Sequence, residues 1–276
     1  MINATGNRMT FEIARQSRLA KSIEQLQISI STAKRIQRPS EDPLASARIA
    51  TIRQAQADAV VWKRNIDLGT SLTAQADGVL KTLNDRLARA QELMVEGASG
   101  SLSQSSRDTI AAEIRAIAEE VDSLALSQSS LGEPLFSSGS PRQLRFADGI
   151  VFAPVPSRSD AFEIGGSTLG QQLQAMASAV QAGDRAQLDA GLATADQLVR
   201  HASDVAANIG NSAARLERLG DSQQARSVDL TAERSSLEST DLTTAIAELN
   251  AQELTLEAAQ AAFARINRRS LIDLLS

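Results

Sequence analysis

The 276-residue sequence has no cysteine and no tyrosine, one histidine, one tryptophan and six phenylalanines. Without cysteine the chain can form no disulfide, no thiolate metal site and no cysteine nucleophile. Aromatic residues make up only 3% of the chain, so we expect thin seams between helices rather than one thick hydrophobic core.

The sequence also lacks any apolar run of about 18 residues, the length that would predict a membrane-spanning helix. Its first residues, "MINATGNRMTFEIARQSRLAKSIEQLQ", have no compact apolar stretch of the kind found in cleavable signal peptides. The net charge is -5, which gives no overall attraction to nucleic acid or to acidic membranes. The first 38 residues are locally basic, but Phe11 is their only aromatic, so neither nucleic acid nor a membrane is expected as a partner.

Signals for catalysis, cofactors or metals are missing as well. His201 is the only histidine, which is too few for a zinc site, and we expect it to be an exposed helical residue. The segment "IGGSTLG" lacks both the P-loop lysine and the GxGxxG spacing, and Ser167 or Thr168 can cap a helix there. We therefore expect no enzyme activity, no cofactor and no metal.

Helix-forming residues are abundant, with Ala, Leu, Gln, Glu and Arg dominating the chain. Apolar residues near each end recur at alternating spacings of three and four, or at multiples of seven, which predicts a helical stripe that needs a partner. These candidate interface residues are Leu19, Ile23, Leu26 and Ile30 near the N-terminus, and Ile246, Leu249, Leu256 and Phe263 near the C-terminus. Because neither stripe has an obvious local partner, we expect the two terminal helices to pair with each other.

The central part of the chain is different. Helical periodicity runs from about residue 44 to 97, through Ile110 to Leu124, and again from about 168 onward. Residues 132–166 instead hold four of the six prolines and four of the six phenylalanines. Within them, "QLRFADGIVFAP" predicts a hairpin that turns at Asp148-Gly149.

These patterns predict a mainly α fold, an elongated antiparallel helical bundle or coiled-coil rod with a small β-hairpin outcrop in mid-chain. Five segments are expected. They are an N-terminal assembly helix (1–42), an outgoing half of the rod (43–131), the outcrop (132–167), a returning half (168–238) and a C-terminal assembly helix (239–276).

A break between two predicted helices carries the most specific motif. The stretch "ISTAKRIQRPSEDPLASARIA" resembles the N-terminal signature of the flagellin superfamily, in the form typical of proteins at the junction of hook and filament. The motif residues are Lys34, Arg35, Pro39, Ser40, Asp42 and Pro43. The ending "AAFARINRRSLIDLLS" is similar to the ending of the same junction form. The family has glycine where this chain has Ala33, so a positive φ at that position would be strained.

This resemblance implies a non-enzymatic structural subunit of the bacterial flagellum, outside the cell, at the junction of hook and filament. Such subunits are exported unfolded by the flagellar type III system and polymerise through terminal helices, which we expect to be loose before assembly. The implied partners are other copies of the chain, a neighbouring hook-associated protein, flagellin and an export chaperone. Two alternatives stay open: a short flagellin that forms the filament itself, and a cytoplasmic coiled-coil scaffold.

Overall fold

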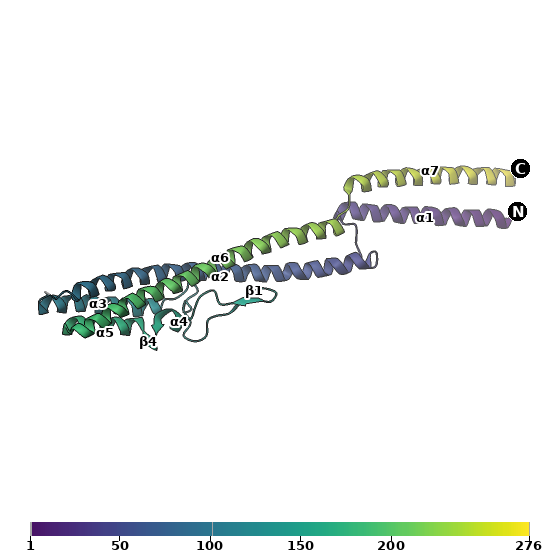
Figure 1. Cartoon of the computed structure of the whole chain (residues 1–276). Coiled ribbons are helices and arrows are strands. Elements are labelled where there is room, and N and C mark those ends of the chain that lie inside the picture. The colour runs from purple at the N-terminus through teal and green to yellow at the C-terminus, as the bar shows by residue number, and fades with distance from the viewer. Residues whose placement is uncertain (1, 101, 276) are drawn as a thin grey trace. The chain divides into compact units, whose positions relative to one another are not determined.

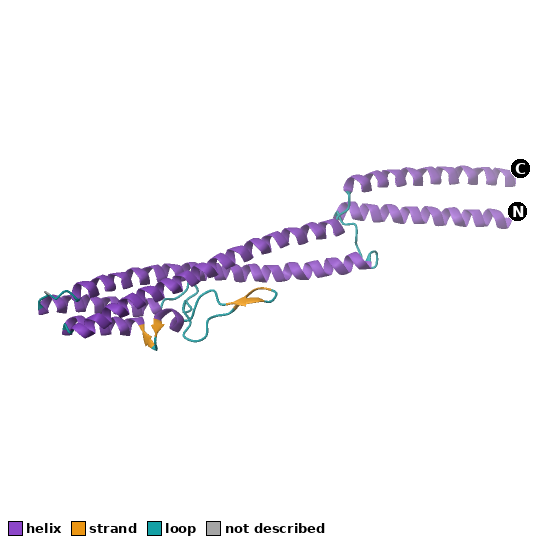
Figure 2. Cartoon of the chain, in the orientation of Figure 1, coloured by secondary structure: helices purple, strands orange, loops and turns teal. Residues whose placement is uncertain are grey.

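The computed structural model describes residues 2–100 and 102–275, with the side chains of residues 9–100 and 102–265. Long helices dominate it, and the strands are few and short (Figures 1 and 2). The helices are α1 (Ile2–Thr32), α2 (Pro43–Gly97), α3 (Gln104–Ala125), α4 (Arg158–Phe162), α5 (Leu169–Ala182), α6 (Arg185–Glu238) and α7 (Leu242–Leu275). The predicted mainly α class, with a small β outcrop in mid-chain, is confirmed.

Local chemistry explains where several helices begin and end. Ser103 caps α3 by accepting a hydrogen bond from the backbone N–H of Ser106. Thr168 caps α5, and its partner Gln171 reaches back to the Thr168 N–H. Gly183 ends α5 with a φ of 67°, so the returning helical region is divided into α5 and α6.

The chain divides into two compact units. One contains residues 1–56 and 227–276, and the other contains residues 57–226, so α2 and α6 each contribute a segment to both. No helix in the described residues is both long enough and apolar enough to cross a membrane.

The unit of residues 57–226 has a continuous hydrophobic core. Fully buried side chains from four helices fill it, among them Leu83 of α2, Ile114 of α3, Leu173 of α5 and Ala202 of α6. Helices α3 and α5 pack closely, and a Cβ added at Gly170 of α5 would collide with Asp122 of α3. Ala, Leu and Ile make up most of this core.

The predicted hairpin forms between β1 (Leu144–Ala147) and β2 (Ile150–Phe152), with Gly149 in the turn at a φ of 69°. A second antiparallel pair joins β3 (Glu163–Ile164) to β4 (Ser167–Thr168). The same region sends two phenylalanines into the main core, where Phe136 and Phe162 pack edge to face with centroids 5.1 Å apart. The outcrop is therefore anchored by aromatic side chains and not by strands alone.

Candidate assembly interface

The terminal helices α1 and α7 lie side by side and run in opposite directions (Figure 1). The start of α1 and the end of α7 are at the same end of this pair. Across the seam, the side-chain amide of Gln27 donates to the carboxylate of Glu253 at 3.5 Å. The predicted pairing of the two ends of the chain is thus present within the unit of residues 1–56 and 227–276.

The predicted stripe on α1 faces the seam. Ile23 is buried, and Leu19, Leu26 and Ile30 are half-buried. We retain these four residues as candidates for an assembly interface, since a seam inside one chain does not itself demonstrate assembly.

The stripe on α7 is displaced by one residue at its beginning. Leu249, Leu256 and Phe263 are half-buried, but Ile246 is 46% exposed and the neighbouring Ala245 is buried in its place. Spacings of four and seven from Ala245 reach Leu249, Leu256 and Phe263, so Ala245 shares their face and Ile246 does not. Ile246 therefore lies outside the seam within this chain and remains a candidate for contact with other subunits, while the sequence did not point to Ala245 because a small alanine gives a weaker apolar signal than isoleucine.

The seam buries little. Ile23 and Ala245 are the only buried residues of α1 and α7 within residues 9–32 and 242–265, the parts of these helices whose side chains are described. Full burial of one large apolar side chain contributes about 1.5–3 kcal/mol, whereas fixing the backbone of one residue costs about 1–2 kcal/mol. In addition, Gln16 Nε2 and Gln252 Oε1 are buried without a hydrogen-bond partner in the described structure, which is unfavourable. This helix pair is consequently weak by itself.

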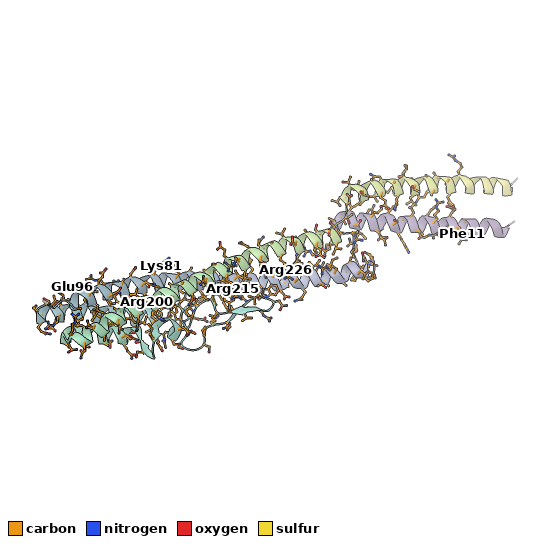
Figure 3. The ribbon with its side chains drawn as sticks, viewed as in Figure 1. Phe11, Lys81, Glu96, Arg200, Arg215 and Arg226 are labelled. Atoms are coloured by element: carbon orange, nitrogen blue, oxygen red, sulfur yellow. The ribbon has the colours of Figure 1, made fainter. Side chains whose placement is uncertain are left out.

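Large apolar side chains also point away from the seam. Phe11, labelled on α1 in Figure 3, is 73% exposed, and Leu254 of α7 is 68% exposed. Ile13 and Ile28 of α1 are exposed as well. A helix pair with apolar residues on both inner and outer faces is typical of an element that becomes buried in a larger assembly.

The motif residues form the turn between α1 and α2. Pro43 is the first residue of α2, and Asp42 Oδ1 caps that helix by accepting from the N–H of Ala45 at 3.0 Å. Pro39 and Ser40 are exposed in the turn. The expected break and restart of the helix is therefore present, and Asp42 is the residue that caps the restart.

Ala33 follows the last residue of α1 and has a φ of 52°. Among the described residues it is the only one other than glycine with a positive φ. The sequence-based concern about strain at this position is confirmed, because a left-handed conformation brings the alanine Cβ close to the following carbonyl oxygen.

The turn is tied to the other end of the chain. Lys34 forms an antiparallel β-bridge with Ser239, the N–H of Arg35 donates to Glu238 O at 2.7 Å, and the N–H of Thr240 donates to Ala33 O at 3.1 Å. We call residues 33–35 and 238–240 together the terminal bridge. It brings residues about 200 positions apart in sequence into direct backbone contact.

Charged pairs link the neighbouring segments of α2 and α6. Arg48 meets Glu233 at 2.6 Å, and Arg53 meets Glu238 at 2.5 Å. The hydrogen bond and charge of Glu233 raise the pKa of Arg48, and the hydrogen bond from Arg48 lowers the pKa of Glu233. At the start of α7, hydrogen bonds from the hydroxyl and N–H of Thr244 lower the pKa of Asp241.

No group of three or more His, Asp or Glu side chains capable of holding a metal is found among the described residues. His201 is half-buried, and not exposed as expected, because its Nε2 lies 3.3 Å from the carbonyl oxygen of Ala161 in α4. Its contact is with the backbone, as in a structural histidine.

Two sequence profiles match the chain. The bacterial flagellin N-terminal helical region matches residues 7–140, and the bacterial flagellin C-terminal helical region matches residues 192–275. The chain belongs to the bacterial flagellin family. This family consists of structural proteins of the bacterial flagellum, which is an extracellular organelle. The chain is therefore assigned to the flagellum.

Named relatives share part of the chain. Flagellar hook-associated protein 3 of Salmonella typhimurium LT2 is 29% identical over 108 residues, which cover 39% of this chain and 34% of that protein. Its Escherichia coli K12 counterpart is 28% identical over 108 residues, with the same coverage of 39% and 34%. A flagellin of Salmonella muenchen is 35% identical over 108 residues, 39% of this chain and 20% of that protein. The match thus spans about a third of the hook-associated relatives.

Solved structures share the fold. FlgL of Bacillus cereus superposes with a TM-score of 0.55 at 20% identity, over 67% of this chain and 99% of that one. The flagellar junction protein FlgL of Legionella pneumophila gives a TM-score of 0.56 at 14% identity, over 70% of this chain and 100% of that one. At such identities the likeness concerns the arrangement of helices and strands.

Proposed function

We propose that the chain is a structural subunit of the junction between the flagellar hook and filament, and that it assembles through α1 and α7. The observation that carries the proposal is the weak terminal pair: of the described side chains of α1 and α7, only Ile23 and Ala245 are buried, while Phe11 and Leu254 remain exposed. The likeness to hook-associated protein 3 and the motif from Lys34 to Pro43 favour the junction over other positions in the flagellum.

The physical mechanism is ordering on docking. An isolated α1 and α7 bury too little apolar surface to offset the entropy of two long helices. When neighbouring subunits cover the exposed apolar side chains, the added burial stabilises the helical state. A helical array or ring requires one patch to meet a different patch on the next copy, and inner and outer apolar faces supply two such patches.

The partners follow from this position. The first partner is another copy of the chain. A neighbouring hook-associated protein lies on one side of the junction, and flagellin lies on the other. Export in an unfolded state by the type III system, with a chaperone that covers the loose terminal helices, completes the proposal. The absence of cysteine suits this route, since an exported unfolded chain without thiols cannot cross-link.

Electron microscopy of flagella labelled with antibody and gold tests the position. A single band of label where the hook meets the filament is expected in cells that produce the chain. Label along the whole filament would instead support a short flagellin, the alternative favoured by the 35% identity to the Salmonella muenchen protein.

Two substitutions test the terminal helices as the assembly element. Leu26→Asp and Phe263→Asp place a carboxylate in the seam and are expected to abolish filament attachment. The conservative variants Leu26→Ile and Phe263→Leu keep an apolar side chain and should retain it. Normal filaments on cells carrying either aspartate variant would refute assembly through this pair.

A further inference from the structure

The terminal bridge lies where four helix ends meet in one unit: the end of α1, the start of α2, the end of α6 and the start of α7. Its two backbone hydrogen bonds, Arg35 N–H to Glu238 O and Thr240 N–H to Ala33 O, do not belong to any helix. They therefore report on contact between the two ends of the chain independently of whether α1 and α7 are helical.

Side chains reinforce the bridge from both sides. The guanidinium of Arg35 donates to the carbonyl oxygen of Leu237, in the last turn of α6, at 3.2 Å. It also lies 3.4 Å from the carboxylate of Asp42. A cation at the end of a helix is favourable because the last carbonyl groups of a helix carry partial negative charge. Asp241 caps α7 by accepting from the N–H groups of Thr243 and Thr244.

The segments behind the bridge are also held together. Ala45, Ile49 and Ile52 of α2 are buried, and Arg48 pairs with Glu233 through two hydrogen bonds of 2.6 and 2.9 Å. Arg234 donates to the side chain of Gln56 at 2.8 Å. Beyond the bridge, by contrast, Ala245 is the last buried residue of the described part of α7. Packing is thus denser behind the bridge than along the seam between α1 and α7.

We propose that the terminal bridge stays closed in the unassembled subunit while α1 and α7 separate and fray from their free ends. The inference rests on the proposed function in one respect, namely that α1 and α7 become ordered on assembly. The closed bridge then holds the bases of the two helices in register, so that docking closes the seam from residues 33 and 240 outward. Helix growth from a formed end avoids the unfavourable nucleation step.

Holding the helices at one point also raises their local concentration. Two segments joined close to their contact site meet at an effective concentration in about the millimolar range, without any new contact. The bridge therefore lowers the entropic cost of ordering two loose helices on the growing structure. The strained Ala33 makes the bridge dependent on the interactions of Arg35.

Amide hydrogen exchange on the purified full-length chain tests the proposal. The amides of Arg35 and Thr240 are expected to show protection factors about tenfold or more above those of α1 amides between residues 11 and 19. Equal or lower protection at Arg35 and Thr240 would overturn the proposal, since the bridge would then open at least as readily as the seam.

A disulfide offers a second test because the wild-type chain has no cysteine. Lys34 and Ser239 are antiparallel bridge partners, and such partners have Cα atoms about 4.5–5.5 Å apart, within the range a disulfide spans. The double variant Lys34→Cys, Ser239→Cys is expected to form an intramolecular disulfide under mild oxidation in the unassembled state. Adding Arg35→Ala should slow this reaction about fivefold.

Arg38→Ala is the matched control, since Arg38 is an exposed arginine of the same turn whose described hydrogen bonds use its backbone: its N–H donates to the Glu41 carboxylate and its carbonyl oxygen accepts from the Glu41 N–H. It should leave the rate of disulfide formation unchanged. No disulfide in the double variant, or equal slowing by Arg35→Ala and Arg38→Ala, would refute a closed bridge supported by Arg35. All these measurements use the unassembled chain, so their failure is distinct from failure of the aspartate variants and gold labelling that test assembly.

Discussion

Arg48 of α2 and Glu233 of α6 are joined by two hydrogen bonds although 185 residues separate them in sequence: Nε to Oε1 at 2.6 Å and Nη2 to Oε2 at 2.9 Å. This two-point geometry fixes one guanidinium against one carboxylate more specifically than a single contact would. Both residues belong to the unit that also contains the terminal bridge. The pair therefore helps define how the end of α6 lies against the start of α2.

A dependence on pH follows from this pair. Its hydrogen bonds lower the pKa of Glu233 in the folded chain below the ordinary value of about 4.3. The pair thus stabilises the fold above that ordinary value, and the contribution is lost as the pH falls through the lowered pKa. Glu233→Gln is expected to reduce the Tm at pH 7, and the difference from wild type should shrink as the pH falls through the lowered pKa of Glu233.

Thermal denaturation followed by circular dichroism at a series of pH values measures this effect. Glu217→Gln is the control, because Glu217 is also an exposed glutamate of α6. Its Tm should remain close to that of wild type at pH 7. A Tm difference for Glu233→Gln that does not shrink as the pH is lowered from 7 into the acid range would contradict the stabilising role of this pair.

Replacing Ala33 by glycine should stabilise the protein, whereas glycine substitutions usually destabilise it. Its φ of 52° is costly for alanine and free for glycine, so Ala33→Gly should stabilise the terminal bridge by about 1 kcal/mol. Ala50→Gly makes the same chemical change at an exposed position inside α2, where glycine costs about 1 kcal/mol. Amide exchange at Arg35 and Thr240 should slow in the first variant and not in the second. Faster exchange in Ala33→Gly would show that the strain is not present.

Phe146 carries the hairpin's attachment to the long helices. It is fully buried and clusters with Ile66 of α2 and Leu216 of α6. The ring centroids of Phe146 and Phe152 are 4.4 Å apart. The guanidinium carbon of Arg215, which Figure 3 labels, lies over the Phe152 ring at 4.0 Å from its centroid. Phe146→Ala should reduce the free energy of unfolding by about 3–5 kcal/mol.

Urea denaturation followed by fluorescence measures this loss, with Trp62 of α2 as the only tryptophan. Val151→Ala on the neighbouring strand is the control. Because Val151 is 50% exposed, its removal should change the free energy of unfolding by less than about 0.5 kcal/mol. Similar losses in both variants would mean that the hairpin is not anchored through Phe146.

Much of this fold could be predicted because its signals are local and periodic. Heptad spacing located α2, α3 and the terminal helices, and Asp148-Gly149 located the hairpin turn. The strain at Ala33 was also predictable, because the family motif has glycine at this position of the turn and this chain has alanine. By contrast, a single bridge between Lys34 and Ser239 has no period and joins distant residues, so no sequence pattern announces it.

The candidate interface was harder to predict than the fold. A stripe of alternating three and four spacings tolerates a shift of one residue, and the larger Ile246 gave the stronger apolar signal although the smaller Ala245 is the one buried. Sequence periodicity also describes only the seam inside one chain. The outward residues Phe11 and Leu254 lie off that period and become informative only once their exposure is known.

The inner and outer apolar residues of the terminal pair should behave differently on substitution. Phe11→Ser and Leu254→Ser remove exposed apolar surface, so the unassembled chain should keep its helical content while attachment of filaments is lost. Ile23→Ser removes the buried residue on the bridge side of α1, the part that frays last, so it should lower the helical content that remains in the unassembled chain as well as assembly. Circular dichroism of purified protein and counts of flagellated cells separate the two effects. If Phe11→Ser and Leu254→Ser cells make normal filaments, the exposed faces of α1 and α7 are not contact surfaces between subunits.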